Sequence, residues 1–156
     1  MIACVAAAYG FDPDFPKCAA NSLRYGSPEA DLAAKQFRQR YGKKLTYCPN
    51  FIADATNLTL DPGEWIVNPD IGSKAQINVT TEYFDPENDV LTFYYQVSGG
   101  KIVGQGAKVF WDLTGLTPGT YTIMAGVNDG AGVCGEIKKR KVEILECAGC
   151  TLRETE

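Results

Sequence analysis

Apolar and polar residues alternate through the second half of this chain, and turn residues interrupt them at short intervals. In residues 91–97, LTFYYQV, apolar side chains occupy every second position, and residues 121–127, YTIMAGV, repeat the pattern. A period of two places alternate side chains on one face of a β-strand. Similar short runs lie at 75–84, 101–106, 107–112 and 136–145. The pattern predicts about seven short strands that form an antiparallel two-sheet β-sandwich over residues 45–146.

The large apolar side chains on these strands are the predicted core of the sandwich. Burying each such side chain is worth about 1.5–3 kcal/mol. The last strand differs, because residues 138–141 are four consecutive charges that cannot all face a core. Lysines on a strand discourage pairing with further strands, so this strand is expected at a sheet edge. The core candidates are Leu91, Phe93, Tyr95, Trp111, Tyr121 and Ile123.

Residues 1–44 have a different character and are expected to form an N-terminal extension with one short α-helix. Ser27 is a good N-cap, Pro28 suits the first helical position and Gly42 suits the end, so the helix should cover about 28–41. Its Phe37 and Tyr41 share one face. They either pack on the adjacent sandwich or dock onto a partner subunit. Residues 147–156 are expected to be a C-terminal tail that carries a CxxC sequence.

Composition excludes several classes of protein. The 156 residues contain no histidine, so a Ser-His-Asp or Cys-His relay cannot be built from this chain alone. The net charge of -4 gives no reason to expect nucleic acid as a partner. No apolar run reaches the length of a membrane span. We therefore expect a non-catalytic protein without a transmembrane segment.

A family resemblance adds to this pattern. Residues 84–132, FDPENDVLTFYYQVSGGKIVGQGAKVFWDLTGLTPGTYTIMAGVNDGAG, resemble bacterial immunoglobulin-like domains of the PKD kind in their DP-x-x-D turn, SGG hairpin, PGTYT segment and closing V-x-DG. The resemblance is close over 79–132 and loose over 45–146, while residues 1–44 resemble no family. It implies an immunoglobulin-like sandwich, and such modules serve as spacers, adhesive units and complex-building domains.

The acidic turn before the strand at 91–97 has two interpretations. Asp85 and its neighbouring proline are suited to shape the turn, which is the structural interpretation. Alternatively, hard carboxylate oxygens from Asp85, Glu87, Asp89 and Asp129 hold calcium, as some PKD-like domains do at comparable turns. No other cofactor is indicated. A hydrolase would need paired acids across a cleft, and its activity would be lost in Asp85→Asn or Asp89→Asn.

Six cysteines, an even number, indicate disulfides and an oxidising compartment. In an immunoglobulin-like sandwich the segment before the first strand and the loop before the last strand share a pole, which predicts a Cys48–Cys134 pair. The remaining neighbours are Cys4 with Cys18, and Cys147 with Cys150. A redox-active CxxC and a zinc site from Cys48, Cys134, Cys147 and Cys150 are weaker alternatives.

The leading hypothesis is a non-catalytic extracytoplasmic module that docks through its N-terminal extension into a larger assembly. This assembly is a cell-envelope or membrane complex, or a surface filament built from copies of the chain. Met1-Ile-Ala-Cys4 also looks like the end of a lipoprotein signal. The alternative is a carbohydrate-binding or adhesive module that stacks sugars on Tyr94, Tyr83 or Trp65. Asn57 and Asn78 each begin a glycosylation sequon.

Overall fold

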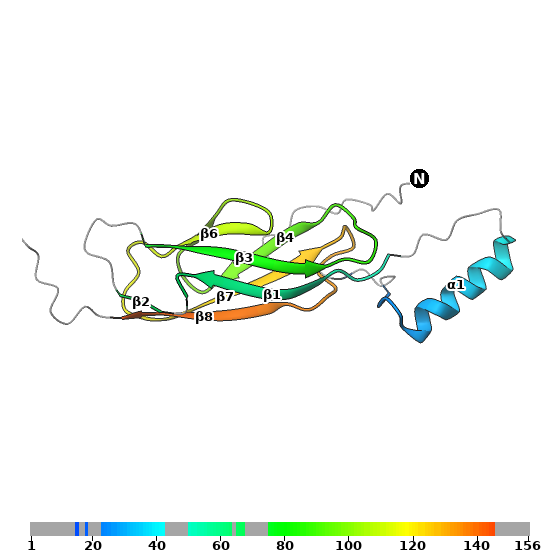
Figure 1. Ribbon diagram of the computed structural model, residues 1–156, viewed down its shortest axis with the longest axis horizontal. Helices are drawn as coiled ribbons and strands as arrows, with labels where there is room; N and C mark the ends of the chain where they lie inside the picture. The colour runs from blue at the N-terminus through cyan, green and yellow to red at the C-terminus, as the bar shows by residue number, and fades with distance from the viewer. Residues whose placement is uncertain are drawn as a thin grey trace, which may run out of the picture. The chain divides into compact units, whose positions relative to one another are not determined.

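The computed structural model describes Phe15, Cys18, residues 23–42, 50–63 and 75–145, and the backbone of 65–67. Over these residues the chain is mainly β with one helix, as the alternation predicts (Figure 1). In chain order the elements are α1 (Pro28–Tyr41), β1 (Asp54–Asp61), β2 (Trp65–Val67), β3 (Gln76–Phe84), β4 (Thr92–Val97), β5 (Lys101–Val103), β6 (Lys108–Asp112), β7 (Gly119–Asn128) and β8 (Lys138–Leu145).

The described strands form two four-stranded sheets. One sheet has the order β1-β3-β6-β5 and the other the order β2-β8-β7-β4. The pairs β3–β6, β5–β6 and β7–β8 are antiparallel, whereas β2 runs parallel to β8. The mainly β class and the layered, sandwich-like arrangement agree with the sequence-based prediction. The immunoglobulin-like type within that class stays a prediction.

The position of strand β8 contradicts one prediction. The strand was predicted at a sheet edge because of its four consecutive charges, but it lies between β2 and β7. The short strand β2 pairs with only the last three residues of β8, Glu143–Leu145. Residues 138–141 lie outside this pairing, so a charged run and an inner position coexist in one strand. The prediction was wrong because the three residues of β2 were not recognised as a strand.

The described residues group into two compact units, each with its own apolar cluster. The first contains the described residues up to Ala55 with Tyr83–Tyr94 and Gly126–Ile137. The second contains Thr56–Glu82, Tyr95–Ala125 and the described residues from Lys138 onward. The first unit therefore combines part of the predicted N-terminal extension with segments of the predicted sandwich.

The larger cluster, in the second unit, is built around Trp111. This side chain is completely buried, and its indole Nε1 donates to the carbonyl oxygen of Gly99 at 2.9 Å. Ile123 is buried in the same cluster, and the half-buried Tyr95 and Tyr121 pack against it. The hydroxyl of Tyr121 also donates to the carbonyl of Thr117 at 2.9 Å, which links the strand to the turn before it.

The smaller cluster, in the first unit, contains Ala53, Ala55 and Val127, with Leu91 and Phe93 packed against it. All six core candidates thus contact one of the two clusters. Only Trp111 and Ile123 are fully buried. Strand β4 contributes to both clusters, because Phe93 packs against the smaller cluster and Tyr95 and Val97 pack against the larger one.

Helix α1 has the bounds that its end signals predict. The Oγ of Ser27 accepts a hydrogen bond from the amide of Ala30 at 3.2 Å, and Pro28 occupies the first turn. Gly42 ends the helix with φ 67°, a left-handed conformation that suits glycine. No helix of the described residues is long and apolar enough to span a bilayer.

Candidate functional site

The acidic turn between β3 and β4 is held by the carboxylate of Asp85. One oxygen of this carboxylate accepts from the amide of Glu87 at 3.2 Å, and the other accepts from the amide of Asp89. Asn88, between them, has φ 57°, which asparagine tolerates better than most residues. Asp85 therefore performs the turn-shaping role that the sequence indicates.

Three carboxylates gather at this turn. One oxygen from each of Asp85, Glu87 and Asp89 lies within 4.8 Å of the other two. We call these three residues the acidic cluster. Glu87 also reaches outside the turn, because its Oε2 accepts from the amide of Phe51 at 2.6 Å. The acidic cluster thereby holds the segment that leads into β1.

The pKa values of two members of the acidic cluster are raised. Burial raises the pKa of Glu87, and the negative charges of Asp89, Asp85 and Asp129 raise it further, while the hydrogen bond from Phe51 lowers it. Burial and the charges of Asp85 and Asp129 likewise raise the pKa of Asp89. A nearby cation would relieve the repulsion that contributes to both shifts.

Asp129, the fourth predicted calcium ligand, is only 2% exposed. Its Oδ1 accepts from the amide of Ala131 at 3.0 Å, and its Oδ2 accepts from the side chain of Asn50 and the amide of Ala53 at 3.3 and 3.4 Å. These bonds hold two loops together. Calcium takes six to eight oxygen ligands. With one oxygen each, the three carboxylates of the acidic cluster would supply at most half of such a shell, so calcium stays a prediction.

Replacing Glu87 with glutamine is expected to raise stability at pH 7 by less than about 1 kcal/mol, because the site is partly solvated. A raised pKa in the folded state favours the protonated form. The contribution of Glu87 to the stability of the folded state is therefore fully present below its unfolded-state pKa, and it is lost as pH rises through its folded-state pKa. Glutamine removes this loss and can still accept the Phe51 hydrogen bond. Thermal melts at pH 3.5 and pH 7 should show a gain for the variant only at pH 7.

The control for this experiment is Glu82→Gln, which removes an exposed negative charge from β3 outside the acidic cluster. An equal gain in both variants would mean that net charge, and not local repulsion, is responsible. The same melts test calcium. If the acidic cluster ligates it, millimolar calcium chloride should raise the melting temperature of the unmodified chain more than that of Glu87→Gln.

The chain preceding α1 is attached to the segment before β1. Leu23 and Phe51 form a parallel bridge, in which the Leu23 amide donates to the Asn50 carbonyl at 2.9 Å and the Ile52 amide donates to the Leu23 carbonyl at 2.8 Å. The rings of Tyr25 and Phe51 pack perpendicular to each other, with centroids 5.3 Å apart. The same segment thus contacts both the acidic cluster and the approach to α1.

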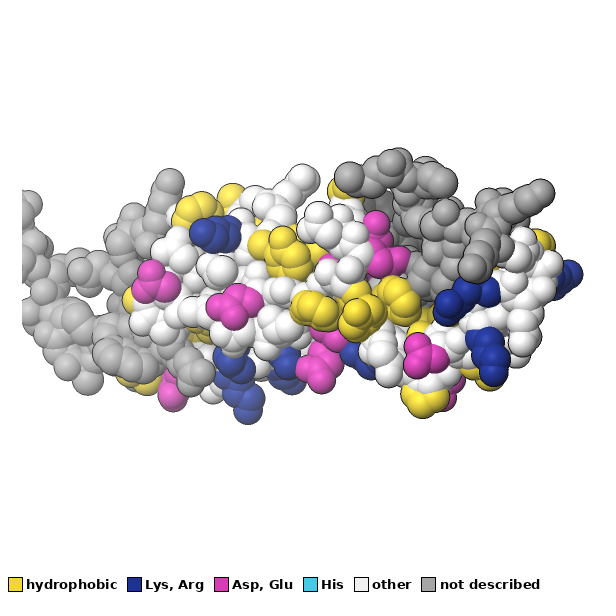
Figure 2. Space-filling model, turned by 45° about the vertical axis from the view of Figure 1, so that its right-hand side comes forward, with side chains coloured by type: hydrophobic (Ala, Val, Ile, Leu, Met, Phe, Trp, Pro, Cys, Tyr) yellow, Lys and Arg dark blue, Asp and Glu magenta, His cyan; other side chains and the backbone are white. Residues whose placement is uncertain are grey.

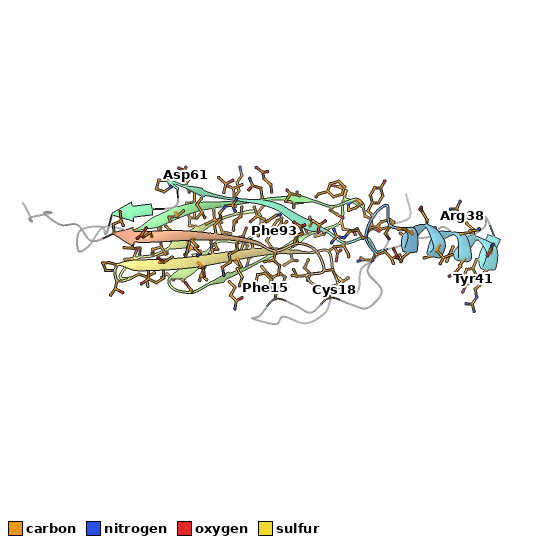
Figure 3. The ribbon with its side chains drawn as sticks, turned by 90° about the horizontal axis from the view of Figure 1, so that it is seen from below. Phe15, Cys18, Arg38, Tyr41, Asp61 and Phe93 are labelled. Atoms are coloured by element: carbon orange, nitrogen blue, oxygen red, sulfur yellow. A yellow bond between two sulfur atoms is a disulfide. The ribbon has the colours of Figure 1, made fainter. Side chains whose placement is uncertain are left out.

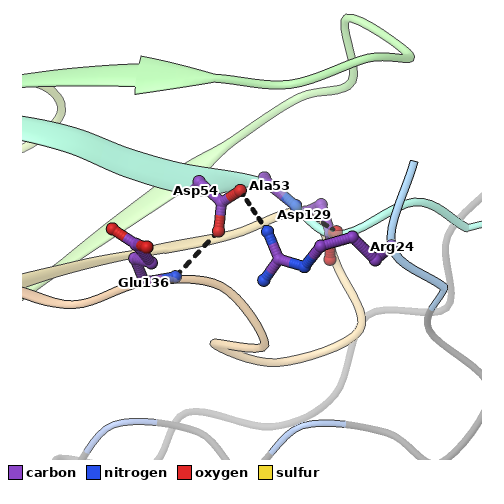
Figure 4. Close-up of polar contacts among 5 residues, drawn as sticks. All are labelled: Arg24, Ala53, Asp54, Asp129 and Glu136. Atoms are coloured by element: carbon purple, nitrogen blue, oxygen red, sulfur yellow. Dashed lines mark hydrogen bonds and ion pairs between the residues drawn. The ribbon is translucent and has the colours of Figure 1, made fainter. Parts of the chain in front are cut away.

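An ion pair reinforces this attachment (Figure 4). The Nη1 of Arg24 lies 2.6 Å from the Oδ2 of Asp54, and the Oδ1 of Asp54 accepts from the amide of Glu136 at 2.8 Å. One carboxylate therefore connects the N-terminal segment, the start of β1 and the segment before β8. Sequence reasoning missed Arg24 and Asp54, because residues 30 positions apart carry no local sign of their contact.

The disulfide that the structure describes joins Cys18 to Cys134, with Cα atoms 4.6 Å apart. Two predicted pairings, Cys48–Cys134 and Cys4–Cys18, are therefore wrong. The topological reasoning placed Cys134 near the start of the sandwich but did not foresee that the N-terminal segment would return there. In agreement with that return, a Cβ added at Gly126 would meet the ring of Phe15 at 2.7 Å. Cys4, Cys48, Cys147 and Cys150 lie outside the described residues.

The predicted docking residues Phe37 and Tyr41 lie in the C-terminal half of α1, and Tyr41 is labelled at the end of the helix in Figure 3. Phe37 is half-buried and its ring lies 4.9 Å from that of Tyr41, which is 45% exposed. Leu32, on the same helix, is 55% exposed. Ala30 is the buried residue of α1. The helix therefore presents large apolar side chains to solvent.

The predicted sugar-stacking residues lie in different environments. Tyr83 is exposed and makes an edge contact with Phe93, with centroids 5.3 Å apart. Tyr94 is half-buried on β4. The side chain of Trp65 lies outside the described residues. Of the two described positions, Tyr83 lies on β3 and Tyr94 on β4, which belong to different sheets.

Comparisons with known proteins identify no family. No protein-family model matches the chain, and a search of curated proteins finds no match to it.

Proposed function

We propose that this chain is a non-catalytic, extracytoplasmic interaction module that joins a larger protein assembly through α1. The observation that carries the proposal is the pair Phe37 and Tyr41, four positions apart on one face of α1, with Tyr41 45% exposed. Large apolar side chains on an amphipathic helix are typical anchors for a groove on another protein. The basic residues Arg38 and Arg40, beside them, would add polar contacts at the rim of such an interface.

The attachment of the preceding chain supports this role. A docking helix that is held close to its own protein would keep a bound partner near that protein. The Cys18–Cys134 disulfide, the Leu23–Phe51 bridge and the Arg24–Asp54 ion pair provide three such connections before α1 begins. Each lies within the first compact unit.

Two further features agree with the proposed location and partner class. A disulfide is typical of the oxidising compartments outside the cytoplasm. Lysine and arginine side chains are interspersed with acidic ones on the face in Figure 2, so that face offers no continuous basic surface for a polyanion. A protein partner, either another subunit or a second copy, is the better match.

The test compares the chain with variants Phe37→Asp and Tyr41→Asp, each tagged and recovered under native conditions from its source cells. Chemical cross-linking and peptide mapping would identify the partner and the residues it touches. We expect cross-links to α1 in the unmodified chain and a loss of at least tenfold in partner recovery with either variant. A tenfold loss corresponds to about 1.4 kcal/mol.

The matched control is Val90→Asp, which places a charge on an almost fully exposed apolar residue away from α1. It should leave recovery unchanged. Light scattering would show whether the partner is a second copy. Partner recovery that is equal in all three variants, or cross-links that avoid α1, would contradict the docking role.

A further inference from the structure

The outward face of strands β3, β6 and β5 presents an ordered grid of side chains. In β6, Val109 and Trp111 are buried, so alternation directs Phe110 and Asp112 outward. In β3, Ile77 and Val79 are buried, which directs Gln76 and Asn78 to the same side. We call this surface, completed by Lys101 and Val103 of β5, the Phe110 face.

Strand register arranges the Phe110 face in two adjacent rows. Phe110 is directly opposite Asn78 on one side and Val103 on the other. Asp112 is directly opposite Gln76 and Lys101. Directly opposite residues in neighbouring antiparallel strands have Cβ atoms about 4.5–5.5 Å apart. One row therefore carries Phe110 between Val103 and the polar Asn78, and the adjacent row is fully polar.

The two apolar side chains of the first row are accessible to solvent. Phe110 is 48% exposed and Val103 is 41% exposed, although Phe110 lies in the middle of an inner strand. A hollow of about 600 Å³ lies over the polar row, lined by Gln76, Gly100, Lys101, Val103, Asp112 and Thr114. This volume is within the range of small-ligand sites, about 300–1,000 Å³.

The polar row is held in position. The Oδ1 of Asp112 accepts from the amide of Thr114 at 3.0 Å, and its Oδ2 lies 3.6 Å from the Nζ of Lys101. Hydrogen bonds from Thr114 and the charge of Lys101 lower the pKa of Asp112, which keeps it an acceptor at neutral pH. A carboxylate has about four acceptor positions, so Asp112 retains capacity for a ligand.

From this arrangement we propose that the Phe110 face binds a neutral pyranose sugar. A pyranose has a face of C–H groups and a rim of hydroxyls that both donate and accept hydrogen bonds. The C–H face fits the electron-rich face of the Phe110 ring. The hydroxyls fit the amides of Gln76 and Asn78, the Asp112 carboxylate and the Lys101 ammonium. Asp112 and Lys101 neutralise each other, which favours a neutral sugar beside them over an anionic one, while the exposed Lys108 lies on the same face beyond Phe110.

This inference concerns a different surface from α1 and does not depend on the proposed docking function. It also differs from the stacking positions expected from sequence, Tyr83, Tyr94 and Trp65. The sequence analysis did not identify Phe110, because it considered only the core-facing side of this strand, to which Trp111 belongs.

The test is a titration of the isotopically labelled chain with neutral oligosaccharides, followed by the backbone amide signals. The probes are β-1,4-linked glucose and N-acetylglucosamine hexamers and an α-linked mannose trimer. The chain should be produced in a bacterial host without N-glycosylation, because a glycan on Asn78 would cover the face. We expect at least one probe to shift the amide signals of Gln76, Asn78, Phe110 and Asp112 in a saturable manner.

Variants distinguish sugar binding from a structural effect. Phe110→Ala should weaken binding of that probe at least about tenfold, whereas Phe110→Trp should retain it. Asp112→Ala should weaken it too, and the control Val90→Ala should not. Thermal melts would verify that each variant is folded, and the Trp and Asp112 variants decide the result if Phe110→Ala is not. No saturable shift with any probe, binding that survives both Phe110→Ala and Asp112→Ala, or self-association through this face instead would overturn the inference.

Discussion

Replacing both Cys18 and Cys134 with serine is expected to lower the free energy of unfolding by about 2–5 kcal/mol. The bond joins residues 116 positions apart. In the chain-entropy model, a cross-link over a loop of roughly 100 residues stabilises by about 4.7 kcal/mol, because it restricts the unfolded chain. Denaturant unfolding of the unmodified chain and the double variant measures the difference.

The single variants Cys18→Ser and Cys134→Ser serve as controls for this experiment, since each removes the same bond. They should lose as much stability as the double variant. Peptide mapping without reductant provides an independent check and should recover a peptide that links Cys18 to Cys134. A peptide that links Cys48 to Cys134 would restore the pairing expected from sandwich topology and contradict the structure.

Replacing Trp111 with alanine is expected to cost about 3–5 kcal/mol of stability. The side chain is completely buried in the larger apolar cluster, and its indole also donates to the carbonyl of Gly99. Alanine would leave a cavity and an unpaired backbone carbonyl. Trp111→Phe, which retains much of the apolar volume but loses the hydrogen bond, should cost less. Denaturant unfolding of the three proteins would measure both steps.

The adjacent residue provides a matched control for this prediction. Phe110 is an aromatic residue on the same strand, but it faces solvent. Phe110→Ala should change stability by no more than about 0.5 kcal/mol, the usual range for surface substitutions. Similar losses for Phe110→Ala and Trp111→Ala would mean that the orientation of β6 is wrong. The sugar-binding inference would then fail as well.

The Cys18–Cys134 bond also bears on the proposed function. Together with the Arg24–Asp54 pair, it attaches the chain before α1 to the first compact unit. If α1 docks onto a partner, the double serine variant should weaken the connection between the bound helix and that unit without changing the residues that touch the partner. The double serine variant therefore tests the attachment of α1 to the first unit, whereas the α1 variants test the contact with the partner.

The resemblance to immunoglobulin-like domains of the PKD kind stays a prediction. Two packed sheets are common to many sandwich families, and strand number and order differ among them. The parallel pair of β2 and β8 was not expected from the antiparallel pattern. A three-residue strand gives too short an alternation to recognise from sequence.

The sequence by itself determined those features whose causes lie within a few residues of each other. These are the alternation that gives β3, β4, β6 and β7, the cap and stop signals that set the bounds of α1, and the Asp85 side chain that shapes its own turn. Tertiary structure alone decided which distant residues meet. The disulfide partner of Cys134, the Arg24–Asp54 pair and the rows of the Phe110 face depend on which strands become neighbours and in what register. Such contacts result from packing the whole chain, so no short stretch of sequence records them.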